Sequence, residues 1–321
     1  MMEQKVLEIK NLNIGYETYR GVTDVIHHLD LDVRKKEKIG VIGESGCGKT
    51  TTMKTINRIL PNNAVIKGGK VNFNGKNVLD MKKKELMKLR RRNVSMIPQD
   101  PTASLNPLFK VKTQMQDILK YSKEHSEEID YKEKSIELFE SVSLSDPERV
   151  YDSYPFQLSG GMRQRVCIAM SLATPKDLLI ADEPTSNLDV TIQNQVLNLI
   201  GNLLEERDLS AILVSQALGT VKKFVDKIYV IYAGTVIEIA KTDKLFSDPI
   251  HPYTIGLLEA TPKLTGGGFS AGIAGQTPDY IDPPSGCRFR PRCPQYSDQC
   301  KNVRPKMVEV EKDHYVACWG K

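Results

Sequence analysis

The sequence predicts an α/β protein with a mostly parallel sheet, and three observations carry this prediction. Short apolar segments alternate with helical patterns through the middle of the chain. A glycine-rich octapeptide, GESGCGKT, stands at residues 43–50 between one such segment and a helical pattern. A second apolar segment, residues 178–181, runs into Asp182 and Glu183. Because ligands of α/β sheets bind at the carboxyl ends of strands, both features favour a phosphate-binding site.

The composition indicates a globular chain of 321 residues, 40% hydrophobic and 26% charged. A net charge of +5 is too small for a dedicated nucleic-acid binder, so we expect no nucleic-acid partner. The longest apolar runs fall short of the roughly 18 residues that a membrane span needs. The amino terminus lacks the pattern of a secretory signal, and we therefore expect a cytoplasmic location.

The strands are expected in two groups. Alternating apolar and polar residues predict a small antiparallel sheet near the amino terminus, from residues 5–14, 28–33 and 70–73. Buried, largely parallel strands are expected at residues 38–43, 94–97, 177–182, 211–215 and 227–232.

Between the strands, a polar and helix-prone stretch at residues 110–150 predicts an inserted helical lobe. The basic clusters at residues 82–84 and 90–92 predict a solvated helix face. Glycines at 266–268, 272 and 275 indicate a linker. We therefore expect a main domain at 1–262 with its helical insertion at about 100–172, a linker at 263–285 and a small cysteine-rich lobe at 286–321.

The octapeptide, here called the phosphate loop, fits the pattern G-x-x-x-x-G-K-[ST] in the strand–loop–helix context that it requires. Its glycines let backbone N–H groups turn toward phosphate oxygens, and the helix amino terminus adds positive potential. Lys49 can reach the β- and γ-phosphates, and Thr50 can ligate Mg²⁺. The predicted ATP-binding residues of this segment are Gly43, Ser45, Gly46, Cys47, Gly48, Lys49, Thr50 and Thr51.

Two acids follow the apolar segment 178–181. Asp182 can hold Mg²⁺ directly or through water, and Glu183 can orient or deprotonate the attacking water. Strands often end in aspartate, so this pattern alone is weak. Together with the phosphate loop it predicts nucleotide hydrolysis.

A glycine pair opens a helical pattern at residues 158–165, LSGGMRQR, and makes a second phosphate-binding helix terminus. The simplest interpretation is that it serves a nucleotide held by a second subunit. This segment resembles the signature of ABC-type ATPases, and the chain is similar to that family at each of these motifs. The resemblance implies that Ser159, Gly160, Gly161 and Gln164 contact the partner's ATP.

Three further positions resemble the family. Gln99, in MIPQDP, resembles the Q-loop glutamine that contacts Mg²⁺ or water and senses a transmembrane partner. Asp189 lies in a segment, SNLD, that resembles the D-loop at the dimer interface. Tyr16 stands where the family places an aromatic ring on adenine, although simple packing is an equal alternative.

The resemblance narrows to the ATP-binding subunits of dipeptide and oligopeptide importers. It rests on QDPTASLNP, ADEPTSNLDV, YAGTVIE and LFSDPIHPYTIGLL with the cysteine-containing tail, and it covers essentially the whole chain. It implies two such subunits closing around two ATP molecules on the cytoplasmic side of the membrane. They would drive two transmembrane permease subunits fed by an external substrate-binding protein. The cargo stays open between dipeptides, oligopeptides, nickel and sugars.

The six cysteines are unevenly placed. Cys47 and Cys167 stand alone, and four crowd into the tail with spacings x5, x6 and x17, at Cys287, Cys293, Cys300 and Cys318. The spacing itself does not decide between Zn²⁺, a [4Fe–4S] cluster and free thiols. The family resemblance implies the [4Fe–4S] cluster. His314 is expected to be a surface residue.

The chain departs from the family at one position. ABC ATPases carry a histidine after the strand that follows the D-loop, where this chain has Gln216, and no histidine occurs between Glu183 and Tyr232. Glutamine can donate a hydrogen bond to phosphate but cannot supply the charge of an imidazolium. The substitution could be tolerated, but we expect a degenerate ATP site and a heterodimer with a homologous subunit that keeps its histidine.

Two other functions are compatible with these motifs. One is a soluble ABC ATPase without a transport role, although the chain lacks the coiled-coil insertion or second cassette of such proteins. The other is an ATP-dependent dimerising scaffold that binds nucleotide without hydrolysing it, which the missing histidine favours.

Overall fold

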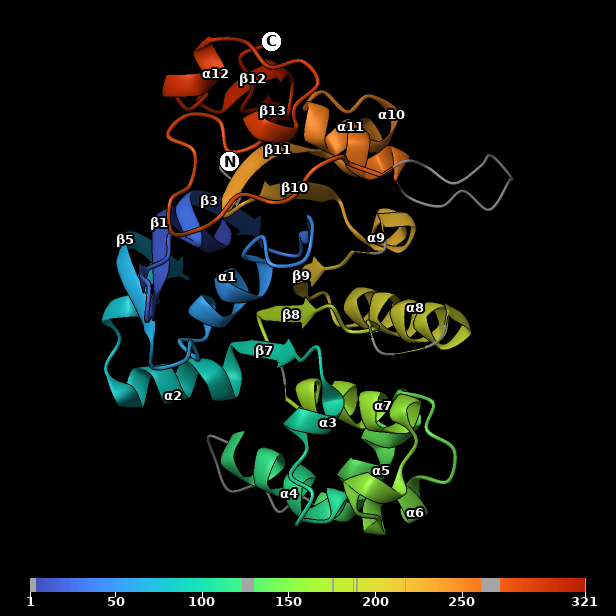
Figure 1. The fold of residues 1–321 in the computed structure, drawn as a ribbon. Coiled ribbons are helices and arrows are strands. Elements are labelled where there is room, and N and C mark those ends of the chain that lie inside the picture. Colours follow the sequence, from blue (N-terminus) through green and yellow to red (C-terminus); the bar gives the residue numbers. More distant parts are fainter. Residues whose placement is uncertain are drawn as a thin grey trace. The chain divides into compact units, whose positions relative to one another are not determined.

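The computed structural model describes residues 4–122, 130–174, 176–186, 188, 190–216, 218–260 and 272–320 (Figure 1). It divides into two compact units. Unit 1 comprises Met1–Asp80 and Leu213–Lys321, and unit 2 comprises Met81–Ile212. The phosphate loop therefore belongs to unit 1, whereas Asp182, Glu183 and the signature segment belong to unit 2. The domain boundaries expected from the sequence stay predictions, and the glycines at 266–268 lie outside the described residues.

The first sheet of unit 1 is the antiparallel sheet that the alternating segments predict. β1 (Lys5–Thr18) pairs with β3 (Ile26–Arg34), with β5 (Ala64–Phe73) and with the short β2 (Gly21–Val22), and β6 (Lys76–Asn77) pairs with β5 (Figure 1). Alternate residues of β1, among them Leu7 and Ile9, are fully buried. β1 and β5 are longer than expected because bulges shift the register after Lys10 and Asn13 and interrupt the alternation.

The second sheet of unit 1 contains a parallel pair and antiparallel strands. β4 (Lys38–Ile42) lies parallel to β10 (Lys227–Tyr232), which forms an antiparallel hairpin with β11 (Thr235–Lys241). Ala233 and Gly234 turn the hairpin, and both have positive φ, as a two-residue type I′ turn requires. The cysteine-rich tail adds β13 (His314–Val316) to β11, and β12 (Val308–Glu311) to β13.

The helices of unit 1 are short, and two of them begin next to the candidate site. α1 (Lys49–Ile56) follows the phosphate loop, as predicted. α11 (Pro252–Glu259) has His251 as its N-cap, whose Nδ1 accepts a hydrogen bond from Tyr253 N–H at 3.0 Å. The others are η1 (Val78–Asp80), α9 (Leu218–Phe224), α10 (Thr242–Ser247), η3 (Arg290–Arg292) and α12 (Gln299–Asn302).

Unit 2 contains a parallel strand pair and the helical lobe. β7 (Val94–Ile97) lies parallel to β8 (Leu178–Asp182), and every residue of β8 is buried. β9 (Ser210–Val214) carries the chain back into unit 1. Buried residues recur at helical spacing in α4 (Val111–Ser122), where Val111 and Met115 have no exposed surface. The remaining helices are α2 (Lys83–Arg92), α3 (Pro101–Ser104), α5 (Tyr131–Ser141), α6 (Pro147–Asp152), η2 (Pro155–Gln157), α7 (Gly160–Ser171) and α8 (Val190–Glu206).

The basic clusters lie on α2, with Lys83, Lys84, Arg90 and Arg91 exposed. The predicted solvated helix face is therefore confirmed.

Candidate functional site

The phosphate loop connects β4 to α1 in unit 1. Its backbone shape and close neighbours explain why two of its positions must be glycine. Gly48 has a φ of 103°, and a Cβ there would lie 2.4 Å from Ile26 Cδ1. A Cβ on Gly43 would lie 2.2 Å from the carbonyl oxygen of Ile231. Side chains at these two positions would force the loop away from β3 and β10.

Lys49 is buried beneath this loop. Its Nζ donates hydrogen bonds to the carbonyl oxygens of Gly43 at 2.7 Å and Glu44 at 2.9 Å. Burial raises the pKa of the Cys47 thiol, which therefore stays protonated and acts as a small packing residue. Ser45 and Gly46 are exposed. The loop thus holds a cation next to backbone that can face a phosphate chain.

Tyr16 lies near the end of β1 and is half-buried. Its hydroxyl is 3.0 Å from Thr51 Oγ1, in the first turn of α1. The structure therefore brings Tyr16 and Thr51 together beside the phosphate loop. Stacking on adenine stays a prediction.

In unit 2 the buried strand β8 ends at Asp182, and Glu183 follows it directly. Asp182 is 1% exposed and Glu183 is 8% exposed. Gln99 Nε2 donates a hydrogen bond to Glu183 Oε2 at 3.1 Å, so two of the three predicted catalytic residues are in contact. Glu183 has a φ of 46°, and such left-handed backbone costs about 1–3 kcal/mol outside glycine. Strain of this kind persists where the surrounding structure fixes a functional side chain.

The signature segment forms the start of α7. Ser159 is the N-cap, and its Oγ accepts a hydrogen bond from Met162 N–H at 3.3 Å. Ser159 and Gly160 are exposed, and a Cβ on Gly160 would meet nothing within 4 Å. Gly161 is half-buried, whereas Gln164 is 1% exposed and belongs to the interior. An anion can therefore approach the helix terminus at Ser159 and Gly160.

The structure also describes Gln216, which stands where the family has a histidine. Gln216 follows β9 in unit 1 and is exposed. Asp189 lies outside the described residues, so its D-loop role stays a prediction.

The four tail cysteines are free and half-buried. Cys287 N–H donates to the carbonyl oxygen of Cys300 at 2.9 Å, which places these two residues side by side. Burial raises the pKa of Cys287 to about 11, with smaller contributions from Cys300 and Cys293. Burial also raises the pKa of Cys293, which interacts electrostatically with Cys318 and Cys300. Within the described ranges, no group of three or more His, Cys, Asp or Glu side chains is arranged to hold a metal ion.

The expectation that His314 lies on the surface is wrong. Its side chain has no exposed surface, and its Nε2 is 2.8 Å from Glu238 Oε1, also fully buried. The same carboxylate accepts backbone N–H groups of Ile250 at 2.8 Å and His251 at 3.0 Å. The error arose because β13 pairs with β11, and the sequence analysis predicted neither strand.

Sequence analysis also missed residues that contact the phosphate loop from outside. Glu44 N–H donates to Tyr253 Oη at 2.9 Å, and its carboxylate forms an ion pair with Arg292. The Tyr280 hydroxyl donates to the carbonyl oxygen of Gly46 at 2.9 Å. The proline after His251 is a local signal that predicts the start of α11, the helix that carries Tyr253. No local signal in a single sequence joins residues that lie more than 200 positions apart.

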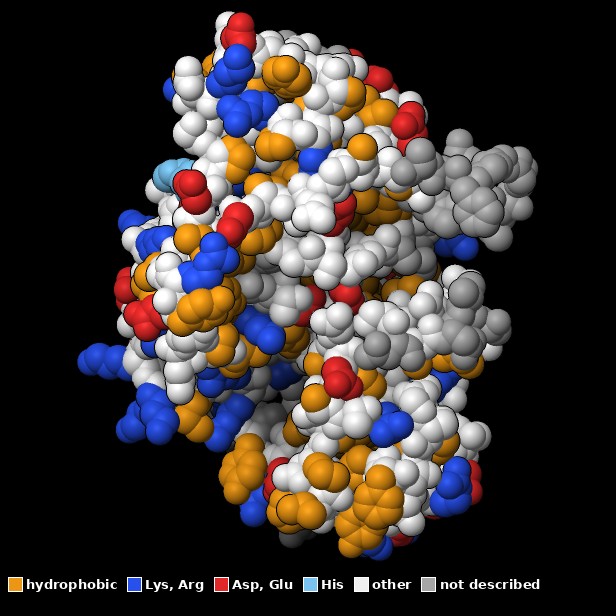
Figure 2. Space-filling view, viewed as in Figure 1, with side chains coloured by type: hydrophobic (Ala, Val, Ile, Leu, Met, Phe, Trp, Pro, Cys, Tyr) orange, Lys and Arg blue, Asp and Glu red, His pale blue; other side chains and the backbone are white. Residues whose placement is uncertain are grey.

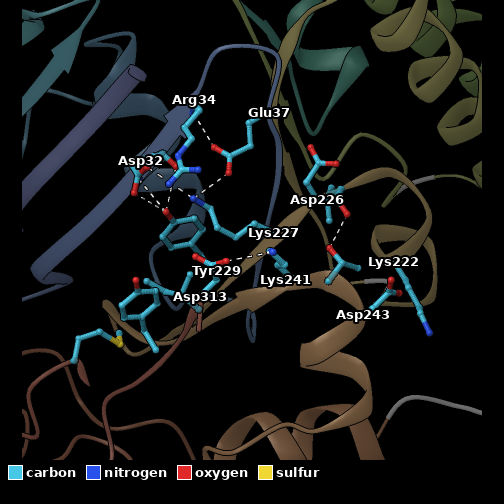
Figure 3. Close-up of a pocket in the computed structure, with 15 residues that line it drawn as sticks. Asp32, Arg34, Glu37, Lys222, Asp226, Lys227, Tyr229, Lys241, Asp243 and Asp313 are labelled. Atoms are coloured by element: carbon cyan, nitrogen blue, oxygen red, sulfur yellow. Dashed lines mark hydrogen bonds and ion pairs between the residues drawn. The ribbon is translucent and has the colours of Figure 1, made fainter. Parts of the chain in front are cut away.

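A cavity of about 700 Å³ also lies in unit 1, but it presents paired charges (Figure 3). Lys227 lies 3.1 Å from Glu37 and 3.8 Å from Asp32. Tyr229 Oη donates to Asp32 Oδ1 at 3.0 Å, and Lys241 pairs with Asp313 at 3.2 Å. None of its lining residues belongs to the phosphate loop. Since both signs of charge line this cavity and the phosphate loop does not, we assign the cavity no part in the reaction.

Comparison with known proteins identifies the family. The family model described as ABC transporter matches residues 26–186. The dipeptide transport ATP-binding protein DppD of Bacillus subtilis (strain 168) is 39% identical over 318 residues, which cover 98% of this chain and 95% of that protein. This chain belongs to the ABC transporter family. The ATP-binding and ATPase activities expected from the motifs are thereby confirmed.

A second family model, described as the C-terminal region of oligopeptide/dipeptide transporters, matches residues 237–300. The oligopeptide transport ATP-binding protein OppD of the same organism is 39% identical, over 98% of this chain and 88% of that protein.

The fold is that of an ATP-binding cassette. A dimeric, post-hydrolysis structure of the cassette MJ0796 bound to ADP and Pi superimposes with a TM-score of 0.66 at 24% identity. The match covers 74% of this chain and 98% of that one. The predicted fold class is confirmed for the cassette. Throughout the part of the chain that is described, no helix combines the length and apolarity required to cross a membrane.

Proposed function

We propose that this chain is the ATP-hydrolysing subunit that powers import of dipeptides or oligopeptides across the cytoplasmic membrane. The observation that carries the proposal is the match at residues 237–300, because it extends beyond the cassette into a region named for these transporters. Relatives named as dipeptide and oligopeptide transport ATP-binding proteins align over nearly the whole chain.

Within the proposal, the phosphate loop and Thr51 bind the triphosphate, and Tyr16 stacks on adenine. The buried ammonium of Lys49, placed between two loop carbonyls, supports this assignment because it can exchange those partners for phosphate oxygens. Thr50, Gln99 and Asp182 are the Mg²⁺ ligands that the sequence motifs predict. Their hydroxyl, amide and carboxylate oxygens suit this hard cation, which neutralises phosphate charge when bound.

Glu183 is the proposed general base. Its carboxylate is nearly buried and takes a hydrogen bond from Gln99, which fixes the oxygen that would accept a proton from water. Gln99 is the proposed link between this carboxylate and the transmembrane partner.

Gln216 makes this chain's own ATP site degenerate under the proposal. A neutral amide cannot stabilise developing phosphate charge as an imidazolium does, and losing one such contact costs about 10²–10³ in rate. Ser159, Gly160, Gly161 and Asp189 are proposed to complete the ATP site of a homologous partner that keeps its histidine, whereas Gln164, which the sequence also suggested, is buried and does not belong to that surface. The exposed Ser159 and Gly160 at the amino terminus of α7 support that role. Gln216 also favours the alternative of a dimerising scaffold.

The proposed attachment to two transmembrane permease subunits uses the helical lobe. Leu108, Phe109 and Phe156 are 80%, 50% and 68% exposed. Val111 N–H donates to the carbonyl oxygen of Ser153 at 2.9 Å, so the loop before α4 runs beside the loop before η2. Figure 2 shows hydrophobic side chains gathered over these helices. Such an exposed apolar patch fits a protein partner at the cytoplasmic side of the membrane.

The tail cysteines are proposed to hold a [4Fe–4S] cluster, with zinc as the alternative. Support comes from four free thiols in one tail, with Cys287 and Cys300 side by side, although the described side chains do not form a preassembled group of three ligands. A bound metal would hold the thiols as thiolates despite the burial that raises the pKa of Cys287. Anaerobic protein should contain about four irons and absorb near about 400 nm. Stoichiometric zinc without iron would exclude the cluster.

The function is tested by peptide-dependent ATPase activity and uptake in vesicles containing this chain with its permeases and partner ATPase. Ser159→Ala with Gly160→Ala should slow uptake by about 10²–10³, since they act on the competent site. Glu183→Gln should slow it little. Uptake that needs Glu183 but not Ser159 or Gly160 would reverse the proposed asymmetry. A complex that binds ATP but turns none over would establish the scaffold alternative.

A further inference from the structure

The outer side of the phosphate loop is covered by side chains from the carboxy-terminal region of unit 1. Arg292 forms a two-pronged ion pair with Glu44, with N–O distances of 2.7 and 3.0 Å. It also donates to the carbonyl oxygens of Ile273 at 3.0 Å and Ala274 at 2.9 Å. The Arg292 side chain is 4% exposed. A planar guanidinium held at this many points fixes the carboxylate that it binds.

Two tyrosines hold the loop backbone itself. Tyr280 donates to the carbonyl oxygen of Gly46, and Tyr253 accepts from the N–H of Glu44, each at 2.9 Å. Because a peptide unit is planar, fixing the Gly46 carbonyl also fixes the Cys47 N–H, which donates to the carbonyl oxygen of Glu44 at 3.3 Å and closes the turn of the loop. Loop N–H groups donate to phosphate oxygens, so their orientation determines how well the loop binds a phosphate chain.

These side chains are themselves anchored. Arg288 donates to Asp24 Oδ2 at 2.6 Å and to the carbonyl oxygen of Ala233 at 2.5 Å. Phe289 packs against the rings of Tyr232 and Tyr253, with centroids 5.1 and 5.5 Å apart. The segment 280–292, here called the strap, is therefore tied to the rest of unit 1 between its two contacts with the loop, which are made by Tyr280 and Arg292.

We propose that Tyr280 and Arg292 of the strap, together with Tyr253, are positioning residues for ATP binding. They do not touch the nucleotide. They hold the phosphate loop in the shape that receives the triphosphate, so ATP need not supply the free energy of ordering it. This inference rests on the proposed assignment of residues 43–50 to the triphosphate.

The experiment measures the Kd of a fluorescent ATP analogue with Mg²⁺ for the full-length chain. Arg292→Ala should weaken binding at least about tenfold, and Tyr280→Phe about three- to tenfold, the size expected for one hydrogen bond. Arg292→Lys should recover part of the loss, because it keeps the charge without the fork.

The matched controls are Arg290→Ala and Tyr296→Phe. Arg290 lies on the same short helix but donates a long 3.5 Å bond to Lys301, and Tyr296 is 59% exposed. Both should bind the analogue as the parent does. For the slow turnover of the full-length chain by itself, Tyr280→Phe should raise the KM for ATP and leave kcat nearly unchanged, because it removes ground-state and transition-state binding equally.

The outcomes separate the inference from the assignment beneath it. If Lys49→Ala abolishes binding while Tyr280→Phe and folded Arg292→Ala bind as the parent does, the positioning role is wrong and the site stands. If Lys49→Ala also binds normally, the triphosphate lies elsewhere. Should Arg292→Ala fail to fold, Tyr280→Phe decides alone, with an unchanged melting temperature required for its affinity to count.

Discussion

The phosphate loop and the cysteine-rich tail, residues 286–321, lie in the same unit but are specified in opposite ways. The turns and the buried cation of the loop come from eight consecutive residues, with Lys49 bonded to carbonyls five and six positions away. The tail is held by partners such as Asp24, Glu44 and Glu238, which lie 76 to 264 positions away. The phosphate loop is thus specified by neighbouring residues, whereas the tail that contacts it is specified by pairs of residues far apart in the sequence.

The largest expected effect tests whether ATP binding depends on a side chain of the phosphate loop itself. Lys49→Ala removes a buried ammonium from the phosphate site and should weaken ATP binding more than about 100-fold. Fluorescence titration measures this loss. Lys54→Ala, in the last turn of α1, is the control and should change nothing. The reactivity of the tail thiols should be the same in both variants.

A second substitution tests the long-range support. Arg288 is 7% exposed and paired with Asp24, and removing one partner of a buried ion pair costs about 3–5 kcal/mol. We therefore expect Arg288→Ala to lower the free energy of unfolding by about that amount in a urea titration. Arg290→Ala should cost little. Equal stabilities for the two variants would contradict the anchoring of the strap.

A third substitution tests the glycine requirement. Gly48→Ala places a methyl group at a φ of 103° and 2.4 Å from Ile26, which should cost about 2–3 kcal/mol of stability. Gly68→Ala is the matched control, because a Cβ there meets nothing within 4 Å. Chemical denaturation of both variants measures the difference. A loop that accepted alanine at 48 without loss would not be specified by its backbone.

The smallest expected effect is a loss of folding stability at acid pH. Burial lowers the pKa of His251 from 6.5 to about 3, so the folded state keeps it neutral while the unfolded state takes up a proton below pH 6.5. Its contribution is complete above pH 6.5 and falls as pH drops toward 3, by about 2 kcal/mol at pH 5. His251→Asn should flatten the stability–pH curve by this amount. His27, with a pKa of about 4 caused mainly by burial, keeps its own slope. If the stability–pH curve of His251→Asn kept the slope of the parent, His251 would not be the source of this acid-dependent loss.

Much of the cassette could be predicted, because its signals are local. The alternation in β1, the apolar runs of β4, β8 and β10, and the glycines before Lys49 each occupy a few consecutive residues. Gln99 and Glu183 were each predicted from their own motif, and the structure shows them in contact. β11 was missed because its turn uses Ala233 before Gly234 and not the asparagine that usually marks a type I′ hairpin.

The tail could not be predicted in the same way. His314 stands between acidic and aromatic residues in a short segment that resembles a surface loop, yet its pairing with Glu238 buries it completely. The Arg292–Glu44 pair spans 248 positions. Polar residues become buried when a distant partner satisfies them, and that partner is identified only in three dimensions.

β13 also has a consequence for solubility. It covers the N–H and C=O groups along the side of β11, which would otherwise be an open template for another chain. The new outer strand, β12, is four residues long, with exposed Glu309 and Glu311. Short, negatively charged border strands resist edge-to-edge association. A truncation before residue 308 would therefore expose an apolar strand to aggregation, independently of any effect on ATP.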